Sequence, residues 1–358
     1  MVSFLWRNSV SVFKIASIFI GTVVGAGLAS GKEIYQFFSV YGTKSFFGFL
    51  ICFIMYVVIG KMIWDISKKR NLSSYNLLIS EICPKFTGKV LNLFTSMYYL
   101  FSSSIIFAAS GSIISQFFSV DKIYGTILMI GITILILKFN MNGIFALNAI
   151  SVPVMICVIF SMFVMFELFS SPINISPSIF VNTVKNEIKM HNNIILSSFL
   201  YGGFNILSAS GVLAPLSVEN SEKNFKRGIV LGSFFLVLIS LIINYLILIN
   251  MPYSGNYDIP LLYVSKIFGK PLQVLILILI WVEMLSTETS SLYSLGKSIS
   301  NKLNITTFKS ILLVMVISIP ISIFGFSKLI SILYPFFGFL SFVFMYYVIK
   351  YKLKNKNG

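Results

Sequence analysis

Long apolar blocks dominate this sequence and restrict what it can fold into. Of its 358 residues, 57% are hydrophobic and only 11% are charged, whereas soluble domains carry about 25% charged residues. Several blocks reach the roughly 20 residues that a helix needs to cross a hydrocarbon core about 30 Å thick. The blocks do not alternate over about 10 residues as the strands of a membrane barrel do. The sequence therefore predicts an all-α transmembrane protein and excludes a soluble enzyme or a disulfide scaffold.

Turn and charge signals divide the chain into ten candidate spans within a single integral membrane domain covering residues 1–358. The third block is too long for one straight span, so it is either tilted or carries a turn outside the membrane. Segments 71–83 and 258–268 mix apolar and polar residues and are candidates for short surface helices. The spans are 9–38, 44–66, 88–118, 123–139, 142–168, 192–217, 228–251, 270–297, 307–325 and 328–350.

The distribution of basic residues predicts the orientation, because Lys and Arg accumulate on the cytoplasmic side of membrane proteins. With both termini inside, 19 of the 27 basic residues fall in cytoplasmic segments and seven fall outside. This placement explains the net charge of +16 without nucleic acid as a partner. The Lys, Asn and Ile content suggests a bacterial coding sequence, so we expect a multi-pass protein of the bacterial cytoplasmic membrane.

Two spans contain glycine clusters that disfavour a continuous helix. The first has four glycines in eleven residues between Gly21 and Gly31, and the sixth has Gly202 and Gly203. Each glycine costs a helix about 1 kcal/mol relative to alanine. Close helix packing is the alternative use of such small residues. Because the clusters fall in spans one and six of ten, corresponding places in two five-span halves (about 9–168 and 192–350), we expect interrupted helices of an inverted repeat.

The run from Gly21 to Gly27 (GTVVGAG) has the G-x-x-x-G-x-G form of the unwound first helix of LeuT-type transporters. The longer stretch from Ile20 to Phe38 (IGTVVGAGLASGKEIYQFF) resembles the opening of the YkvI-like family, permeases of the amino acid–polyamine–organocation superfamily. The LAPL ending of span six, the length and the span count are also similar. The resemblance implies a LeuT-type fold of five plus five spans and transport of an amino acid-like solute.

An unwound first span would expose backbone N–H groups at the start of its second half, where the helix dipole favours an anionic group. Gly25, Ala26 and Gly27 lack bulky side chains and would let a substrate carboxylate approach. On the sixth span, Tyr201, Gly202, Gly203 and Asn205 would complete the substrate site.

The eighth span carries two carboxylates and five hydroxyls between Glu283 and Ser291. Such groups within a span are costly and point to function. Sodium symporters of the LeuT type place small-x-x-Thr/Ser-Ser/Thr on this helix, and the resemblance implies a Na⁺ site at Gly21, Val24, Ser286, Thr289 and Ser290. A register starting at Thr287, followed by Ser290 and Ser291, fits the spacing equally well.

Glu283 and Glu288 offer a second form of coupling, because a buried carboxylate can carry a proton. The coupling ion is thus Na⁺ or H⁺, and no other cofactor is expected. A structural role is the alternative, with either acid paired to a neighbour such as Lys32. Lys32 and Glu33 themselves could gate an outer vestibule or pair locally.

Other polar residues carry weaker signals. Tyr98, Tyr99 and Ser102–Ser104 of span three could line a cavity, as could Asn148 and Ser151 of span five, and His191 precedes span six. The chain shows no Walker loop, zinc-ligand spacing or nucleophile elbow, so no enzyme activity is expected. The leading hypothesis is a secondary transporter of a small solute in the lipid bilayer. The first alternative is a nutrient-receptor subunit resembling spore-germinant receptors. The second is a channel, for which the sequence shows no pore-lining motif.

Overall fold

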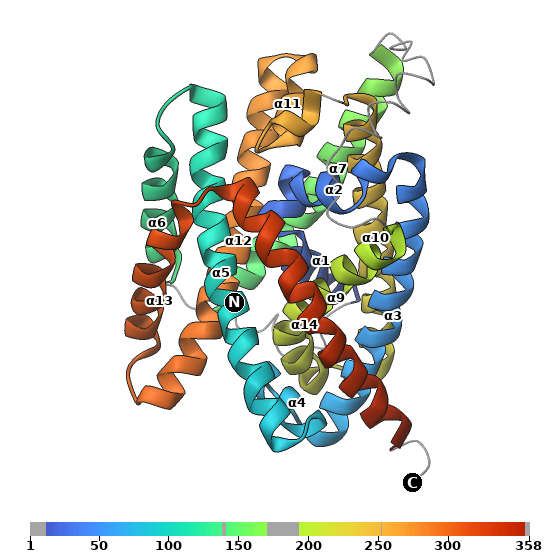
Figure 1. Cartoon of the computed structure of the whole chain (residues 1–358), viewed down its shortest axis with the longest axis vertical. Coiled ribbons are helices and arrows are strands. Elements are labelled where there is room, and N and C mark those ends of the chain that lie inside the picture. The colour runs from blue at the N-terminus through green and yellow to red at the C-terminus, as the bar shows by residue number, and fades with distance from the viewer. Residues whose placement is uncertain (1–11, 138–140, 170–192, 252, 355–358) are drawn as a thin grey trace, which may run out of the picture.

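The computed structural model describes residues 12–137, 141–169, 193–251 and 253–354, and these are helical with no strand (Figure 1). Short helices α2 (Lys32–Phe37), α4 (Tyr75–Ile82) and α11 (Pro260–Ser265) connect the long ones, together with 3-10 turns η2 (Ser39–Lys44), η3 (Tyr253–Asn256) and η4 (Lys266–Phe268). The long helices of the first half are α1 (Val12–Ser30), α3 (Ser45–Arg70), α5 (Lys85–Phe118), α6 (Lys122–Leu137) and α7 (Met141–Phe169). Those of the second half are α9 (Ile194–Glu219), α10 (Glu222–Ile249), α12 (Lys270–Leu303), α13 (Thr307–Ser322) and α14 (Phe326–Lys354).

The ten helices correspond one to one with the ten predicted spans. Eight have the length and apolar character to cross a membrane, and α6 and α13 are shorter apolar helices of 16 residues each. The long third block is one continuous helix, α5, of 34 residues, which at 1.5 Å per residue is about 51 Å long. Segments 71–83 and 258–268 contain the short helices α4 and α11. The chain is therefore a multi-pass membrane protein.

Helix pairing repeats between the two halves. Helix α1 packs on α10 and α9 packs on α3, while α5 packs on α6 and α12 on α13. Glycines allow the close approach of α1 and α10, because a Cβ on Gly228 would lie 2.6 Å from Ile15 Cγ2 and one on Gly232 would lie 3.0 Å from Phe19 Cδ1. This pairing is what an inverted repeat of five plus five spans requires.

The break predicted in the first span is present in α1. Gly25 has φ 46° and ψ −169°, a non-helical conformation in the middle of the helix. Gly31, with φ 81°, then turns the chain into α2. Both positive φ angles are ones that side chains disfavour, so the glycines fix the places at which the helix can change direction.

The break predicted in the sixth span is absent, and this prediction is wrong for the conformation observed. Helix α9 is continuous from Ile194 to Glu219, and none of its residues has a positive φ. Its glycines pack against neighbouring helices instead, Gly202 against Met55 of α3 and Gly203 against Ser341 of α14. Small residues at helix contacts serve the same purpose in many membrane proteins.

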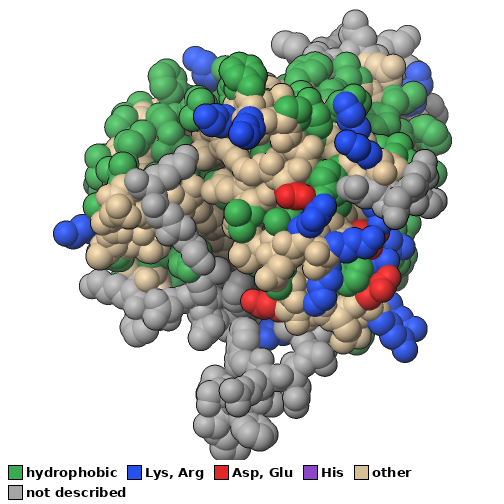
Figure 2. Space-filling view, turned by 90° about the horizontal axis from the view of Figure 1, so that it is seen from below, with side chains coloured by type: hydrophobic (Ala, Val, Ile, Leu, Met, Phe, Trp, Pro, Cys, Tyr) green, Lys and Arg blue, Asp and Glu red, His purple; other side chains and the backbone are tan. Residues whose placement is uncertain are grey.

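The two ends of the bundle carry different ionic contacts. Figure 2 shows Lys and Arg side chains gathered with Asp and Glu on the face where α14 ends. On that face Asp65 of α3 pairs with Lys226 of α10 at 3.3 Å and with Lys352 of α14, and Arg70 pairs with Glu81. At the opposite end Asp258 pairs with Lys122 at 2.9 Å and accepts hydrogen bonds from Ser112 and Ser327.

Candidate functional site

The break in α1 lies against α12. A Cβ placed on Gly25 would lie 3.6 Å from Thr287 Cγ2 and 3.8 Å from its Oγ1. Thr287 Oγ1 is buried, and among the described residues it has no hydrogen-bond partner. The structure therefore brings together the unwound glycine of the first span and a hydroxyl of the eighth, Thr287, which belongs to the alternative register of the predicted cation site.

Glu33 folds back onto the same break. The turn at Gly31 directs the Glu33 side chain over Gly27, where a Cβ would overlap the carboxyl group. Glu33 is 3% exposed, and its Oε2 has no hydrogen-bond partner among the described residues. The protein's own carboxyl group thus occupies the surface of the break on which we expected a substrate carboxylate.

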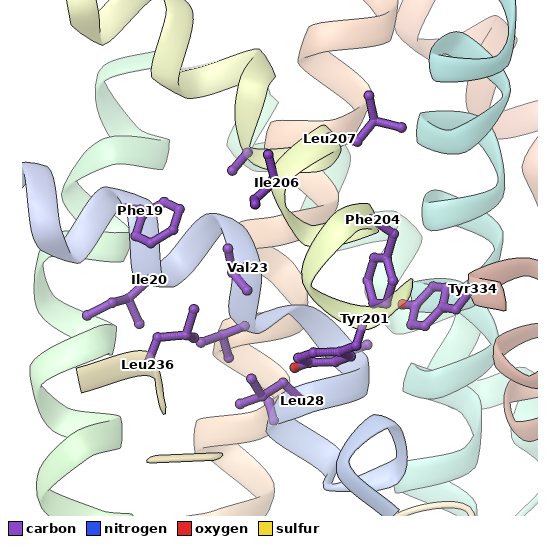
Figure 3. Close-up of a cluster of buried hydrophobic side chains, with 14 of the residues drawn as sticks. Phe19, Ile20, Val23, Leu28, Tyr201, Phe204, Ile206, Leu207, Leu236 and Tyr334 are labelled. Carbon is purple, nitrogen blue, oxygen red and sulfur yellow. The ribbon is translucent and has the colours of Figure 1, made fainter. Parts of the chain in front are cut away.

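Aromatic side chains from α9 and α14 face this carboxyl group. The hydroxyls of Tyr334 and Tyr201 face Glu33. Phe204 stands between the two tyrosines, with ring centroids 5.3 Å from Tyr201 and 4.6 Å from Tyr334. Figure 3 shows these three rings side by side, next to Leu28 of the second part of α1. Phe37, 5.6 Å from Tyr201, packs from α2.

The remaining predicted substrate residues divide into two groups. Asn205 donates a hydrogen bond of 3.0 Å to the Tyr56 hydroxyl and lies beside Tyr201, so it supports the aromatic cluster. Gly202 and Gly203 contact α3 and α14, and with α9 unbroken they offer no free N–H groups to a ligand. Gly25, Ala26 and Gly27 are buried at the break.

The two acids of α12 are both buried, but they face different helices. Glu288 accepts a hydrogen bond of 2.5 Å from Ser103 of α5, and its Oε2 has no partner among the described residues. Glu283 faces Ser151 of α7, although no hydrogen bond of good geometry joins them. Neither acid forms an ion pair in the described part of the chain.

Two hydroxyl groups that were predicted to bind a cation donate hydrogen bonds to carbonyl groups of their own helix. Thr289 Oγ1 donates to the carbonyls of Leu285 and Ser286, and Ser290 Oγ donates to Ser286. Ser286 is buried. Gly21 and Val24 are buried, four residues and one residue before the break. Of the two registers, the one starting at Thr287 places an unsatisfied hydroxyl against Gly25.

Lys32 does not direct its ammonium group to the acids of α12. Its Nζ donates to the carbonyls of Gly255 at 3.1 Å and Tyr257 at 2.8 Å, and the group lies 5.4 Å from the Tyr35 ring. Lys32 thus ties the start of α2 to the loop after α10, while Glu33 turns inward. The side chains of these two neighbouring residues, for which the sequence left one gate or one local pair open, make separate contacts.

Span three does reach the interior. Tyr98, Tyr99 and Ser102–Ser104 are all buried, and Tyr99 donates to the carbonyl of Ser208 at 3.3 Å. His191 and the side chain of Asn148 lie outside the described residues. No group of His, Cys, Asp and Glu side chains suited to a metal ion occurs in the described part of the chain.

Sequence reasoning missed two members of the cluster, Tyr56 and Tyr334. Tyr334 precedes Pro335 within an apolar span, and a polar residue beside a helix-disrupting proline is a signal that could have found it. Tyr56 lies in an apolar run of α3 with no comparable signal.

Comparison with known proteins gives the family of the chain. No protein-family model matches it. The membrane protein YkvI of Bacillus subtilis (strain 168) is 30% identical over 338 residues, covering 94% of this chain and 94% of YkvI. The chain belongs to the YkvI family. YyaD of the same organism is 23% identical over 355 residues, covering 98% of this chain and 99% of YyaD.

Solved structures confirm the LeuT-type fold expected for a YkvI-family chain. Mhp1, a nucleobase-cation-symport-1 family transporter, in a closed conformation with bromovinylhydantoin bound, superposes with a TM-score of 0.62 at 12% identity, covering 88% of this chain and 72% of that chain. A Na⁺-coupled sialic acid symporter in a substrate-bound outward-open state also superposes with a TM-score of 0.62, at 14% identity. The match covers 92% of this chain and 76% of that chain. At these identities the similarity establishes the fold.

Proposed function

We propose that the protein is a secondary transporter that moves a small amino acid-like solute by alternating access, coupled to Na⁺ or H⁺. The observation that carries this proposal is the break at Gly25, buried at the centre of the bundle and lined by unsatisfied polar groups of α2 and α12. Unwound backbone inside a membrane is tolerated where it lines a binding site or is buried in protein. Interrupted helices near the midplane are the usual site in transporters built from inverted repeats.

The solved neighbours support the same class of function. One is described as a Na⁺-coupled symporter of sialic acid, another as a nucleobase-cation symporter, and a third as a manganese transporter from Eremococcus coleocola. These neighbours bind or carry different solutes, so they support transport as the class of function. The substrate of this chain has to be inferred from the residues of its own site. We place the protein in the bacterial cytoplasmic membrane with both termini inside.

The two forms of coupling use different residues. A Na⁺ ion would take carbonyl oxygens of Gly21 and Val24 together with hydroxyls of α12, from the set Ser286, Thr287, Thr289 and Ser290. A proton would be carried by Glu283 or Glu288, which are buried without a cationic partner among the described residues. Buried charge without compensation is costly, and protonation removes that cost.

A nutrient receptor remains the second candidate, because a receptor of this fold would bind a solute at the same break without moving it. Purified protein in sealed liposomes, supplied with a pool of labelled solutes under an imposed Na⁺ or H⁺ gradient, separates the two. Gradient-dependent uptake that Gly25→Val abolishes would support the transporter and identify its ion. Saturable binding without uptake under either gradient would favour the receptor.

A further inference from the structure

A surface groove lies between α3 and α10, at the end of the bundle where α14 ends. It has a volume of about 530 Å³. From α1 it includes Val12, which is 13 residues and thus about 20 Å along the helix from Gly25. The groove is therefore separate from the break in α1. The residues that matter to its chemistry are Phe53, Lys61, Lys226, Arg227, Val230 and Phe234.

The groove is basic at its outer end and apolar further in. Helix α3 ends and α10 begins at this end of the bundle. Phe53 is eight residues before Lys61, and Phe234 is seven residues after Arg227, so the two rings lie about 10–12 Å deeper along their helices. Phe234 is 51% exposed and Val230 is 36% exposed. The apolar part of the groove is therefore open to the hydrocarbon around the protein.

Two of the basic side chains have no acid to compensate them. Neither Lys61 nor Arg227 forms an ion pair with an Asp or Glu of the described residues. The nearby acids Asp65 and Glu222 are both engaged by Lys226, whose Nζ lies 3.3 Å from the first and 2.6 Å from the second. The groove thus presents two uncompensated positive charges above apolar surface.

We propose that this groove binds an anionic phospholipid, with its phosphate group against Lys61 and Arg227 and its acyl chains along Phe53 and Phe234. Such a lipid has its charge and its apolar chains in the same order as the groove. Lys61 falls within the predicted span 44–66, where a basic residue is costly, and a lipid phosphate would neutralise it there. Basic pockets between membrane helices bind anionic headgroups in this way.

Other ligands fit the groove less well. A soluble phosphate would neutralise the two cations but leave the exposed rings uncovered. A zwitterionic lipid would bring its own ammonium group near Lys61 and Arg227, and like charges repel. The proposal adds a lipid ligand to the protein and does not depend on whether the protein transports a solute.

Native mass spectrometry of the purified full-length protein tests the proposal, because it resolves each bound lipid by mass. Titrations with dioleoylphosphatidylglycerol and dioleoylphosphatidylcholine compare two lipids that share their acyl chains and differ in headgroup charge. We expect the first phosphatidylglycerol to bind about tenfold more tightly than the first phosphatidylcholine, from the attraction of two basic residues for an anionic lipid.

Charge variants assign this preference to the groove. Lys61→Gln combined with Arg227→Gln should reduce it to about threefold or less, whereas Lys61→Arg combined with Arg227→Lys keeps both charges and should preserve it. The matched control is Lys85→Gln combined with Lys89→Gln, at two exposed lysines of α5. The control removes the same charge from outside the groove and should keep the tenfold preference.

A steric variant tests the groove itself. Val230→Trp fills part of it without a change of charge, so it should weaken phosphatidylglycerol binding about fivefold or more. Melting temperatures in detergent identify any variant that fails to fold, and the charge-preserving pair remains informative in that case.

Three results would overturn the proposal. They are equal affinity of the unchanged protein for the two lipids, an equal loss of preference in the α5 control, and unchanged phosphatidylglycerol binding by Val230→Trp. A failure of solute uptake in liposomes would reject the transporter and leave the lipid site standing.

Discussion

At the scale of single residues, Gly25 is the position on which the break depends. Its φ of 46° with ψ of −169° is a conformation that costs a residue with a side chain about 1–3 kcal/mol. Space is not the obstacle, since the nearest atom to a Cβ there is 3.6 Å away. Gly25→Ala should therefore lower the free energy of unfolding by about 1–3 kcal/mol, because the strain raises the free energy of the folded protein itself. Thermal unfolding in detergent measures this, with Gly131→Ala, where a Cβ would have no neighbour within 4 Å, as the control.

Thr287 is the hydroxyl that the break contacts directly, and it tests the register of the cation site. Replacing it with Val removes an unsatisfied Oγ1, whereas Thr289 already donates to Leu285 and Ser286. A contact to a charged group is worth about 1.5–3 kcal/mol. Thr287→Val should thus raise the Na⁺ concentration for half-maximal uptake by tenfold or more, and Thr289→Val should have a smaller effect. The reverse order would restore the register starting at Ser286.

The sequence predicts the part of this site that depends on local backbone conformation. It does not predict the part that depends on how distant segments pack. The break at Gly25 follows from glycine's freedom at positive φ, which the sequence displays. The position of Glu33 over Gly27 depends on the turn at Gly31, and a straight helix would rotate residues six apart by about 240° onto different faces. The Tyr334 hydroxyl, on the last helix, faces Glu33. No local sequence pattern predicts a contact between two positions 301 residues apart.

At the scale of elements, Asp258 connects the α11 segment to three helices. It accepts hydrogen bonds from Ser112 of α5, Lys122 of α6 and Ser327 of α14. Burial opposes the ionised form, but these donors outweigh it and lower the pKa of Asp258. A pKa below the unfolded value of about 3.9 means that these contacts stabilise the fold above about pH 4 and lose their effect as the pH falls through the lower folded value.

Asp258→Asn should consequently reduce stability at pH 7 by about 1 kcal/mol, a modest amount because the ion pair is partly exposed. The variant should also flatten the decline of the melting temperature as the pH falls below about 4, since it has no carboxyl group to protonate. Thermal unfolding in detergent, followed from pH 7 down into this acid range, measures both effects. Glu222→Gln is the control. If the melting temperature of Asp258→Asn falls at acid pH as steeply as that of the unchanged protein, protonation of Asp258 does not cause the decline.

Glycine clusters show how far sequence can predict an element. In α1 the cluster produces a break, and in α9 a similar cluster produces close contacts with α3 and α14. Both outcomes are available to small residues in a membrane. Neighbouring helices decide between them, and the sequence of one span does not contain the neighbours. The existence of the ten helices was predictable because every span in lipid must satisfy its own backbone hydrogen bonds.

At the scale of the whole molecule, the orientation in the membrane decides which end of the bundle opens to the cytoplasm. Lys and Arg side chains gather at the end with Asp65, Arg70 and Lys226 (Figure 2), and 19 of the 27 basic residues lie in the segments that the sequence predicts to be cytoplasmic. Lys and Arg near short loops remain on the cytoplasmic side. The Asp258 end should then face outward, which would make the contacts of Lys32 with the η3 loop a closure on the outer side.

Single-cysteine labelling tests this orientation in intact cells. Cys157 is exposed, while Cys52 and Cys83 are buried, so Cys157→Ala gives a suitable background. Tyr124→Cys, at the start of α6 (63% exposed), and Leu353→Cys, near the end of α14 (60% exposed), place thiols at opposite ends of the bundle. A membrane-impermeant maleimide should label the first from outside and the second only after permeabilisation. The opposite pattern would put the basic face outside, against the charge bias, and the Lys32 contacts would then close the cytoplasmic side.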